Sequence, residues 1–532
     1  MKILVSFLLI LIEFNFTAFG QTPQAFKYQA VARDLSGNVL VSKNISLRIS
    51  ILQGSVSGSS VYIETHSKTT NAFGLVDLEI GNGSSPTGNF STINWAVASY
   101  YLKVEMDPSG GSDYQLMGTA QLLSVPYALH AKTAETVTKV KGIYNVVDYG
   151  AFTNNSNAAA TSTAIQNAVN DCINGGDGVV YFPVGIYAIN GPINVNLATS
   201  SKSIKIIGEG TGLTKLVFQS GANDGLNITF SNGALMDGYK GSIVVRDFTI
   251  SCIGSNQGGT AIKLTGTGAT SPMPGKEINN IVINGIGGSD CWTYGVRAIN
   301  ATYSNIYDIN YGGPATASSV ATHLGTGISI ESNAGACDFF IRSCHFTHAN
   351  IGINVLSNGS NGAEGVYVQQ CAMVFVNTGV KWIAPSGSKE PCLFLTGTHI
   401  NALQYNVYAE NLMQAQISGN LFYQNSDFVA NWIGIYINNT TNAADNDLVH
   451  INNNIIHGFK NLPPSSQAIS LVRCGTASIN NNLIYYCKRA IDFTTGSSGL
   501  YNANVVYNKF ISCDLGVNGA SPPSGSVVNS NP

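Results

Sequence analysis

Charge is what this 532-residue chain lacks most. Charged residues make up 10% of it, and the formal net charge is -3. A nucleic-acid-binding surface needs clustered Lys and Arg to neutralise phosphates, and the sequence has no such cluster. Long apolar runs are also missing after the first 20 residues, so no later stretch is long enough to cross a bilayer as a helix. We therefore expect neither a nucleic-acid partner nor a membrane span.

Cysteine is absent from the first 171 residues, and none of the ten that follow stands in a close Cys-x-x-Cys pair. Structural zinc sites normally show such pairs. A glycine-rich phosphate-binding loop and a Ser-His-Asp pattern are missing as well. The sequence therefore predicts no metal and no cofactor.

Glycine is abundant, and many glycines mark a repeat between about Gly241 and Gly519. Residues 451–456 read Ile-Asn-Asn-Asn-Ile-Ile and recur at 479–484 as Ile-Asn-Asn-Asn-Leu-Ile. Each copy has a small anchor residue followed by alternating apolar and polar positions, and the anchors are Gly295, Gly327, Gly352, Gly379, Gly434, Ala468, Ala490 and Gly516. They lie 22 to 34 residues apart, except that a degenerate copy at Asn406 fills one double interval. Such a repeat with variable insertions is typical of a stacked solenoid.

Registering the copies aligns several polar residues. Asparagines at equivalent positions predict an internal ladder at a bend, made by Asn420, Asn454, Asn482 and Asn508. Cys344 falls above Cys371, and Cys487 above Cys513. We interpret these cysteines as small core residues. A disulfide is the alternative, because neighbours in a parallel ladder lie about 4.8 Å apart.

The two ends of the chain read differently from the repeat. Residues 1–20 combine Lys2, a short apolar run and a small-residue site before Gln21, which predicts a secretory signal peptide. An uncleaved membrane anchor is the alternative, but Glu13 breaks the run. We therefore expect a secreted or cell-surface protein, on the outside of a bacterial envelope. The polar residues 525–532 are predicted to be a disordered tail.

Residues 21–128 contain six short alternating segments separated by turn residues, which predicts a small antiparallel β-sandwich. The Ala-rich residues 129–142 are predicted to be a linker with a short helical stretch. The module resembles the N-terminal modules that precede collar, collagen-like or fibre regions in exported envelope proteins. That resemblance implies attachment to a cell-surface or fibre assembly.

A helix and a Gly-rich strand open the second part of the chain. Residues 146–151 read Val-Val-Asp-Tyr-Gly-Ala, residues 161–173 carry apolar residues at helical spacing, and residues 175–187 begin Gly-Gly-Asp-Gly. A helix here would cap the apolar end of a solenoid. Together with residues 204–212, these segments resemble the opening of the pectate-lyase-like superfamily. The resemblance implies an all-β fold over residues 143–524, a right-handed single-stranded parallel β-helix. The family's opening carboxylates are replaced around Asn154 and Ala159.

Short motifs at 362–368, 395–401 and 414–423 resemble bacteriophage tailspike polysaccharide depolymerases. This resemblance implies a polysaccharide as partner and a homotrimer as assembly. The catalytic motif sets of polygalacturonases and of pectate lyases are absent, which disfavours pectin chemistry of those kinds.

Function in a solenoid is expected on the outer face, where equivalent residues of neighbouring coils form a strip. Lys381, Tyr408 and Tyr436 are successive outward residues of one strip, and Tyr367 points out from another sheet. Aromatic faces suit the apolar C–H faces of sugars, so these four residues are candidate polysaccharide contacts. The alternative is an aromatic ladder that only stabilises the sheet.

Acidic residues border one side of the predicted solenoid. Glycoside hydrolysis needs two carboxylates, and Glu364 is the candidate general acid, with Glu410, Asp338 and Glu331 as partners. Glu390, Asp445 and Asp447 lie in neighbouring turns. A lyase would need a base such as His399, Lys381 or Tyr408. The alternatives are solvated turn carboxylates and, for the equivalent pair His345 and His399, histidines hydrogen-bonded at a bend.

The sequence therefore predicts an exported two-domain protein that binds and degrades a polysaccharide, as a hydrolase or a lyase. A non-catalytic glycan-binding adhesin or structural surface fibre is the alternative, favoured by the lost opening carboxylates and the low charge.

Overall fold

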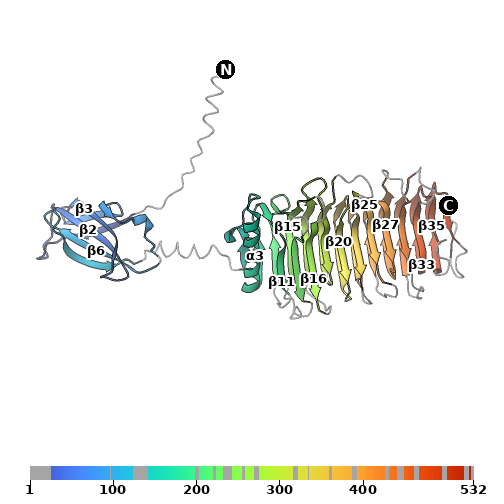
Figure 1. Cartoon of the computed structure of the whole chain (residues 1–532), viewed down its shortest axis with the longest axis horizontal. Helices are drawn as coiled ribbons and strands as arrows, with labels where there is room; N and C mark the ends of the chain where they lie inside the picture. Colours follow the sequence, from blue (N-terminus) through green and yellow to red (C-terminus); the bar gives the residue numbers. More distant parts are fainter. Residues whose placement is uncertain are drawn as a thin grey trace, which may run out of the picture. The chain divides into compact units, whose positions relative to one another are not determined.

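The chain forms two compact units, Met1–Thr138 and Lys139–Pro532, each with its own hydrophobic core (Figure 1). The computed structural model describes residues 25–123 and 142–528, apart from residue 96 and the segments 198–202, 220–222, 232–241, 255–257, 269–274, 316–321, 334, 359–361, 386–391, 426–430, 440–447, 460–465, 494–499 and 520–526. The predicted signal peptide and most of the predicted linker lie outside the described residues.

The N-terminal unit packs a two-stranded antiparallel sheet, β1 with β4, and a five-stranded sheet in the order β5-β3-β2-β6-β7 around one core. Inward residues such as Leu47, Ile49 and Ile51 alternate with less buried ones. The strands are β1 (Phe26–Val31), β2 (Asn44–Gln53), β3 (Ser60–Thr69), β4 (Leu75–Ile80), β5 (Ser84–Thr87), β6 (Tyr100–Asp107) and β7 (Gln115–Gln121). The six predicted strands are confirmed. β5 escaped prediction because its four residues are all exposed and carry no apolar alternation.

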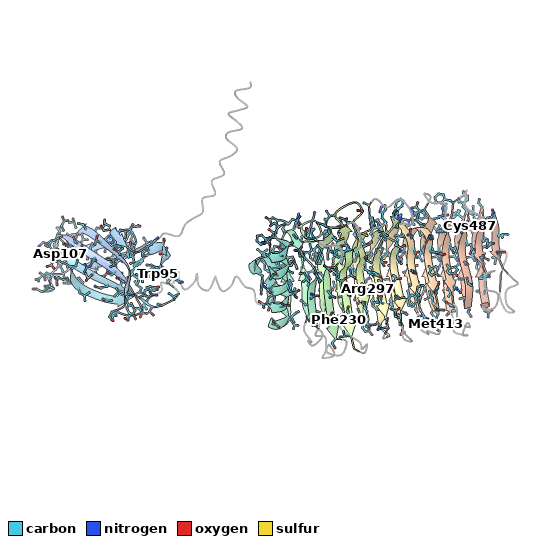
Figure 2. The ribbon with its side chains drawn as sticks, viewed as in Figure 1. Trp95, Asp107, Phe230, Arg297, Met413 and Cys487 are labelled. Carbon is cyan, nitrogen blue, oxygen red and sulfur yellow. The ribbon has the colours of Figure 1, made fainter. Side chains whose placement is uncertain are left out.

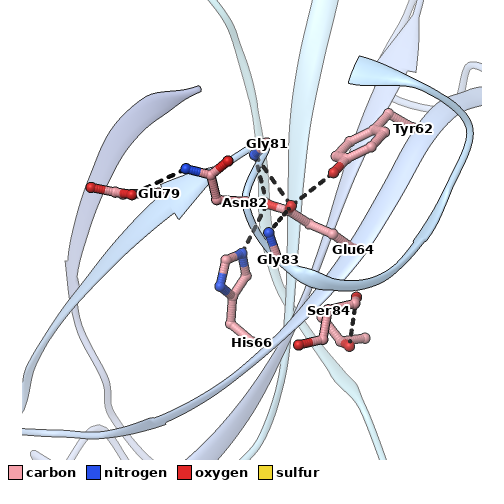
Figure 3. Close-up of polar contacts among 9 residues, drawn as sticks. Tyr62, Glu64, His66, Glu79, Gly81, Asn82, Gly83 and Ser84 are labelled. Atoms are coloured by element: carbon pink, nitrogen blue, oxygen red, sulfur yellow. Dashed lines mark hydrogen bonds and ion pairs between the residues drawn. The ribbon is translucent and has the colours of Figure 1, made fainter. Parts of the chain in front are cut away.

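A buried carboxylate fixes the turn between β4 and β5 in this unit (Figure 3). Glu64 is completely buried, and its oxygens accept hydrogen bonds from the Tyr62 hydroxyl at 2.9 Å and the Gly83 amide at 2.6 Å. The Gly81 amide donates to both oxygens, and His66 Nε2 lies 2.8 Å from Oε1. Burial of a carboxylate is costly unless it is hydrogen-bonded, and here the donors of the turn supply those bonds.

The second unit is a parallel β-helix in which each full coil contributes a strand to three faces, called A, B and C. Face A contains β11 (Ile193–Leu197), β14 (Leu226–Ser231), β16 (Gly258–Thr267), β18 (Trp292–Ile299), β20 (Thr326–Ser332), β23 (Ile351–Ser357), the second halves of β25 (Ala372–Ile383) and β27 (His399–Glu410), β30 (Ile433–Asn438), the first half of β33 (Gln467–Asn480), β35 (Arg489–Asp492) and β38 (Leu515–Asn518). The predicted all-β solenoid is confirmed.

Face B follows face A along the chain in each full coil. It contains β8 (Ile143–Asn145), β9 (Gly178–Tyr181), β12 (Ile204–Ile207), the first halves of β15 (Ile243–Cys252), β17 (Lys276–Gly285) and β19 (Ser304–Gly312), then β21 (Cys337–Arg342), β24 (Glu364–Gln369), β26 (Leu393–Thr396), β28 (Gln414–Ser418), β31 (Leu448–Asn452), the second half of β33, β36 (Leu500–Val506) and β39 (Val527–Val528).

Face C completes the coil. It contains β10 (Gly185–Ile189), β13 (Thr214–Phe218), β22 (His345–Thr347), β29 (Leu421–Gln424), β32 (Ile455–His457), β34 (Leu483–Tyr485) and β37 (Lys509–Ile511), together with the remaining halves of β15, β17, β19, β25 and β27.

The predicted asparagine ladder lies at the bend between faces B and C. The Asn420 side-chain amide donates to Asn454 Oδ1 at 3.0 Å, Asn454 to Asn482 at 3.0 Å, and Asn482 to Asn508 at 2.9 Å. Each side-chain amide also donates to a strand carbonyl, for example that of Asn454 to Ile417 O at 2.9 Å. The ladder is confirmed, and it satisfies polar groups that no water reaches.

The small anchor residues are explained by packing at the start of face A. A Cβ atom on Gly327 would lie 2.2 Å from the Phe346 ring, and one on Gly352 would lie 2.6 Å from the Met373 sulfur. Side chains of face C therefore fill the space that a larger anchor would need. The degenerate copy keeps Asn406, whose buried amide donates to Ile400 O at 2.8 Å.

The predicted capping helix is confirmed as α3 (Ala158–Gly175), which lies at the N-terminal end of the solenoid after η2 (Val146–Tyr149) (Figure 1). Its buried side comprises Thr161, Ala164, Ile165, Ala168, Val169 and Cys172. At the other end, the predicted disorder of residues 525–532 is wrong for β39, because Val527 and Val528 pair in register with Asn504 and Val505 of β36.

Candidate functional site

Three tyrosines form a platform on the outside of face A. Lys381, Tyr408 and Tyr436 are in-register neighbours on β25, β27 and β30, as predicted. The Tyr408 and Tyr436 rings are stacked, with centroids 5.2 Å apart and planes inclined by 23°. Tyr405 meets Tyr408 edge to face at 4.9 Å. We call Tyr405, Tyr408 and Tyr436 the tyrosine platform. Tyr405 was not predicted, because it precedes the degenerate anchor.

The hydroxyl groups of the tyrosine platform are protonated and can therefore donate hydrogen bonds. Burial raises the pKa of Tyr405 and of Tyr436. For Tyr408, burial and the hydrogen bond that its hydroxyl donates to Glu410 Oε1 together raise the pKa. All three hydroxyls are therefore protonated at neutral pH. Tyr408 is held as a donor, which disfavours the predicted role as a lyase base.

Two charges flank the platform. Glu410 is the last residue of β27, and its Oε1 accepts a hydrogen bond from the Tyr408 hydroxyl. Lys381 is half-buried and forms no ion pair with any residue that the structure describes. Lys381 therefore lies one ladder step before Tyr408 and has no ion-pair partner among the described residues, whereas the carboxylate of Glu410 lies two residues after Tyr408 on the same strand.

Glu331 is engaged elsewhere on face A. Arg297 donates to its two oxygens at 2.7 and 2.8 Å, and Ser329 Oγ donates at 3.0 Å. The Arg297 guanidinium also lies 4.8 Å from the centre of the Tyr294 ring. Figure 2 labels Arg297 part-way along the solenoid. This bidentate pair neutralises Glu331, which is only 6% exposed. Arg297 is not among the residues predicted from the sequence, although its strand β18 lies one coil before the strand of Glu331.

Register separates Glu331 from Glu410. The row passes from Glu331 through Leu356 and Ile383 to Glu410, which is three ladder steps. At about 4.8 Å per step the strands lie roughly 14 Å apart. A glycosidase pair needs about 5 to 9.5 Å. The two glutamates therefore do not flank one glycosidic bond.

The remaining predicted acids lie at the start of face B. Cys337 and Glu364 are in-register partners, and a Cβ on Gly365 would lie 2.9 Å from Asp338 Oδ1. Asp338 and Glu364 therefore come from adjacent coils. Burial first, then the charges of Asp338 and Glu364, raise the pKa of Tyr367. These acids and Tyr367 form a second group, separate from the platform.

Tyr367 itself belongs to an aromatic stack. Its ring lies 4.8 Å from Phe340, inclined by 13°, and 4.6 Å from Phe394, inclined by 3°. Both faces of the Tyr367 ring are therefore covered by other rings, and only its edge is open to a ligand. The stack fits the alternative of sheet stabilisation better than it fits sugar binding.

His399 lies on face C. Ala372 separates it from His345, as the predicted two-coil spacing requires. Its ring stacks on Tyr423 at 5.1 Å, and burial, with His345 nearby, lowers its pKa, so it is neutral at pH 7. Neither Lys381 nor Glu410 shares its face. Glu390, Asp445 and Asp447 lie outside the described residues, and within the described part no three His, Cys, Asp or Glu side chains are placed to hold a metal.

The coils that lead into the platform match a known family. Residues 143–375 match the family described as "Rhamnogalacturonase A/epimerase, pectate lyase-like". The second unit is a pectate lyase-like β-helix domain. Residues 27–120 match a domain of unknown function, DUF8740. The pectate lyase-like match ends at residue 375, before Lys381 and the platform.

Several solved structures are similar to the chain. One is ORF18 of Geobacillus virus E2, at 16% identity over 78% of this chain and 68% of that chain, with a TM-score of 0.34. The A-module of the mannuronan C-5 epimerase AlgE4 from Azotobacter vinelandii shows 14% identity over 73% and 100%, with a TM-score of 0.36. The pre-mature gene product 12 of bacteriophage phi29 shows 15% identity over 72% and 54%, with a TM-score of 0.46. No curated protein sequence matches the chain.

Proposed function

We propose that the pectate lyase-like domain binds an acidic polysaccharide along the outside of face A. The observation that carries this proposal is the tyrosine platform beside Lys381. Tyrosine rings offer an apolar face to sugar C–H groups and a hydroxyl to sugar oxygens. The ammonium group of Lys381, unpaired among the described residues, is suited to a carboxylate or sulfate of the same polymer.

Binding is tested with a panel of acidic and neutral polysaccharides in affinity electrophoresis. We expect retardation by acidic polymers only, and about tenfold weaker binding by Tyr436→Ala, equivalent to ~1.4 kcal/mol. Tyr367→Ala is the matched control, because it removes a tyrosine from face B instead. If Tyr367→Ala weakens binding and Tyr436→Ala does not, the polysaccharide binds elsewhere.

Cleavage of the bound polymer is a second candidate function, and the orientation of Glu410 by Tyr408 favours it. The panel is then read by reducing ends for a hydrolase and by the absorbance of unsaturated uronates for a lyase. Tight binding with neither signal would establish the non-catalytic alternative, a glycan-binding adhesin or fibre.

Attachment is proposed for the N-terminal unit. A cleft of about 600 Å³, lined mainly by apolar side chains, opens between β1 and β7. Among the strands that the structure describes, β7 pairs only with β6, and its residues Leu116 and Met117 are 61% and 41% exposed. An unpaired strand edge next to an apolar cleft supports a role in contacting another protein. Export to the cell surface stays part of this proposal.

A further inference from the structure

Cys487 and Cys513 occupy equivalent positions in two successive coils near the C-terminal end of the solenoid, where Figure 2 labels Cys487. Before them, Tyr485 pairs with Ile511, and after them Arg489 pairs with Leu515. Both flanking registers place Cys487 directly beside Cys513. In-register strands lie about 4.8 Å apart, within the Cα separation that a disulfide requires.

The two thiols point the same way. Cys487 Sγ lies 3.2 Å from Tyr485 O, and Cys513 Sγ lies 3.7 Å from Ile511 O. Cys513 Sγ also lies 3.7 Å from Ile484 O, an atom of the coil that carries Cys487. The Cys487 thiol is hydrogen-bonded to Cys513, which holds the pKa of Cys513 at about 7. A thiol of this kind is partly ionised at neutral pH and nucleophilic.

Exposure differs between the members of the pair. Cys513 is half-buried, so a small reagent can reach it, whereas Cys487 is 3% exposed. A second pair, Cys344 and Cys371, has the same relative position in successive coils, but both residues are at most 2% exposed. Cys344 and Cys371 are therefore close enough for a disulfide, but a reagent in solvent cannot reach their thiols.

We propose that Cys487 and Cys513 form a reversible disulfide in the folded protein, joining two coils near the C-terminal end of the solenoid. The oxidant is a small-molecule disulfide. The Cys513 thiolate attacks one of its sulfurs and expels one small thiolate, and the Cys487 thiolate then attacks Cys513 Sγ and expels the second. One S–S bond forms in the protein and one breaks in the oxidant. The two protons lost by the cysteines are taken up by the two expelled thiolates, so that two electrons and two protons convert the small disulfide into two thiols.

The bridge restrains coils at the end of the solenoid, and terminal repeats have a neighbour on one side only. Closing the intervening segment removes conformations from the unfolded state of these coils. Oxidation is therefore expected to slow proteolysis of the C-terminal coils and leave the remainder unchanged.

The test treats the full chain in its native state with oxidised glutathione. Free thiols are then alkylated, and the disulfide-linked peptides are mapped by mass spectrometry with and without reductant. We expect a peptide pair that links Cys487 to Cys513, restored to thiols by dithiothreitol, and full alkylation of Cys344 and Cys371 only after unfolding. Cys513→Ser should abolish the linked pair without changing the circular dichroism spectrum.

Three results would overturn the proposal. The first is that Cys513 stays fully alkylatable after treatment with oxidised glutathione, and the second is that it carries only a stable glutathione adduct. The third is that the buried pair Cys344 and Cys371 oxidises at the same rate as Cys487 and Cys513. The last result would mean that oxidation follows unfolding rather than the native geometry.

Discussion

At the residue scale, two glutamates in one row of face A have different partners. Glu331 is clamped by Arg297 and Ser329, so its oxygens are occupied within the fold. The carboxylate of Glu410 accepts a hydrogen bond from the Tyr408 hydroxyl and, among the described residues, from no other group. The same residue type is therefore structural at one height of the solenoid and a candidate for chemistry at another.

Replacement of Glu410 tests that assignment. If the protein cleaves a polysaccharide on face A, Glu410→Gln should lower the rate by at least about 100-fold, the lower range for removing an acid or base. Glu364→Gln, on face B, should keep the rate. Initial rates on the polymer identified in the panel measure both, and the reverse pattern would place the reaction at Asp338 and Glu364.

At the element scale, the asparagine ladder adds side-chain hydrogen bonds at the bend between strands that backbone pairing already holds in register. Asn454 Oδ1 accepts from both the backbone and the side-chain amide of Asn420, each at 3.0 Å. Its own side chain donates to Asn482 Oδ1 and to Ile417 O. Removal of one asparagine side chain from the ladder therefore leaves hydrogen-bond donors and acceptors of its neighbours unsatisfied in the buried core.

We expect Asn454→Ala to lower the free energy of unfolding by ~2–4 kcal/mol, since each unsatisfied buried group costs about 1–3 kcal/mol. The exposed Asn502→Ala on the outside of β36 is the control, with an expected change within about 0.5 kcal/mol. Urea unfolding followed by circular dichroism measures both. Equal midpoints for the two variants would mean that the ladder does not stabilise the solenoid.

At the scale of the whole molecule, the two units have separate cores, and separate roles are proposed for them. Trimerisation remains a prediction from the tailspike resemblance. Sedimentation equilibrium at micromolar concentration should give three times the mass of 56.1 kDa calculated for the full sequence, or slightly less if residues 1–20 are removed. A single species at the mass of one chain would contradict it. The β-helix unit expressed alone shows which unit carries the contacts.

The sequence by itself determined the solenoid, its capping helix, the asparagine ladder, the cysteine pairs and the strip of Lys381, Tyr408 and Tyr436. Each of these follows from periodicity, because one position per coil fixes both height and face. Only the tertiary structure decided which side chains contact one another on the outer faces of the solenoid. Tyr405, the Arg297 clamp on Glu331 and the covered faces of the Tyr367 ring depend on side-chain directions across coils. Those directions are set by packing between neighbouring strands, which a linear repeat does not encode.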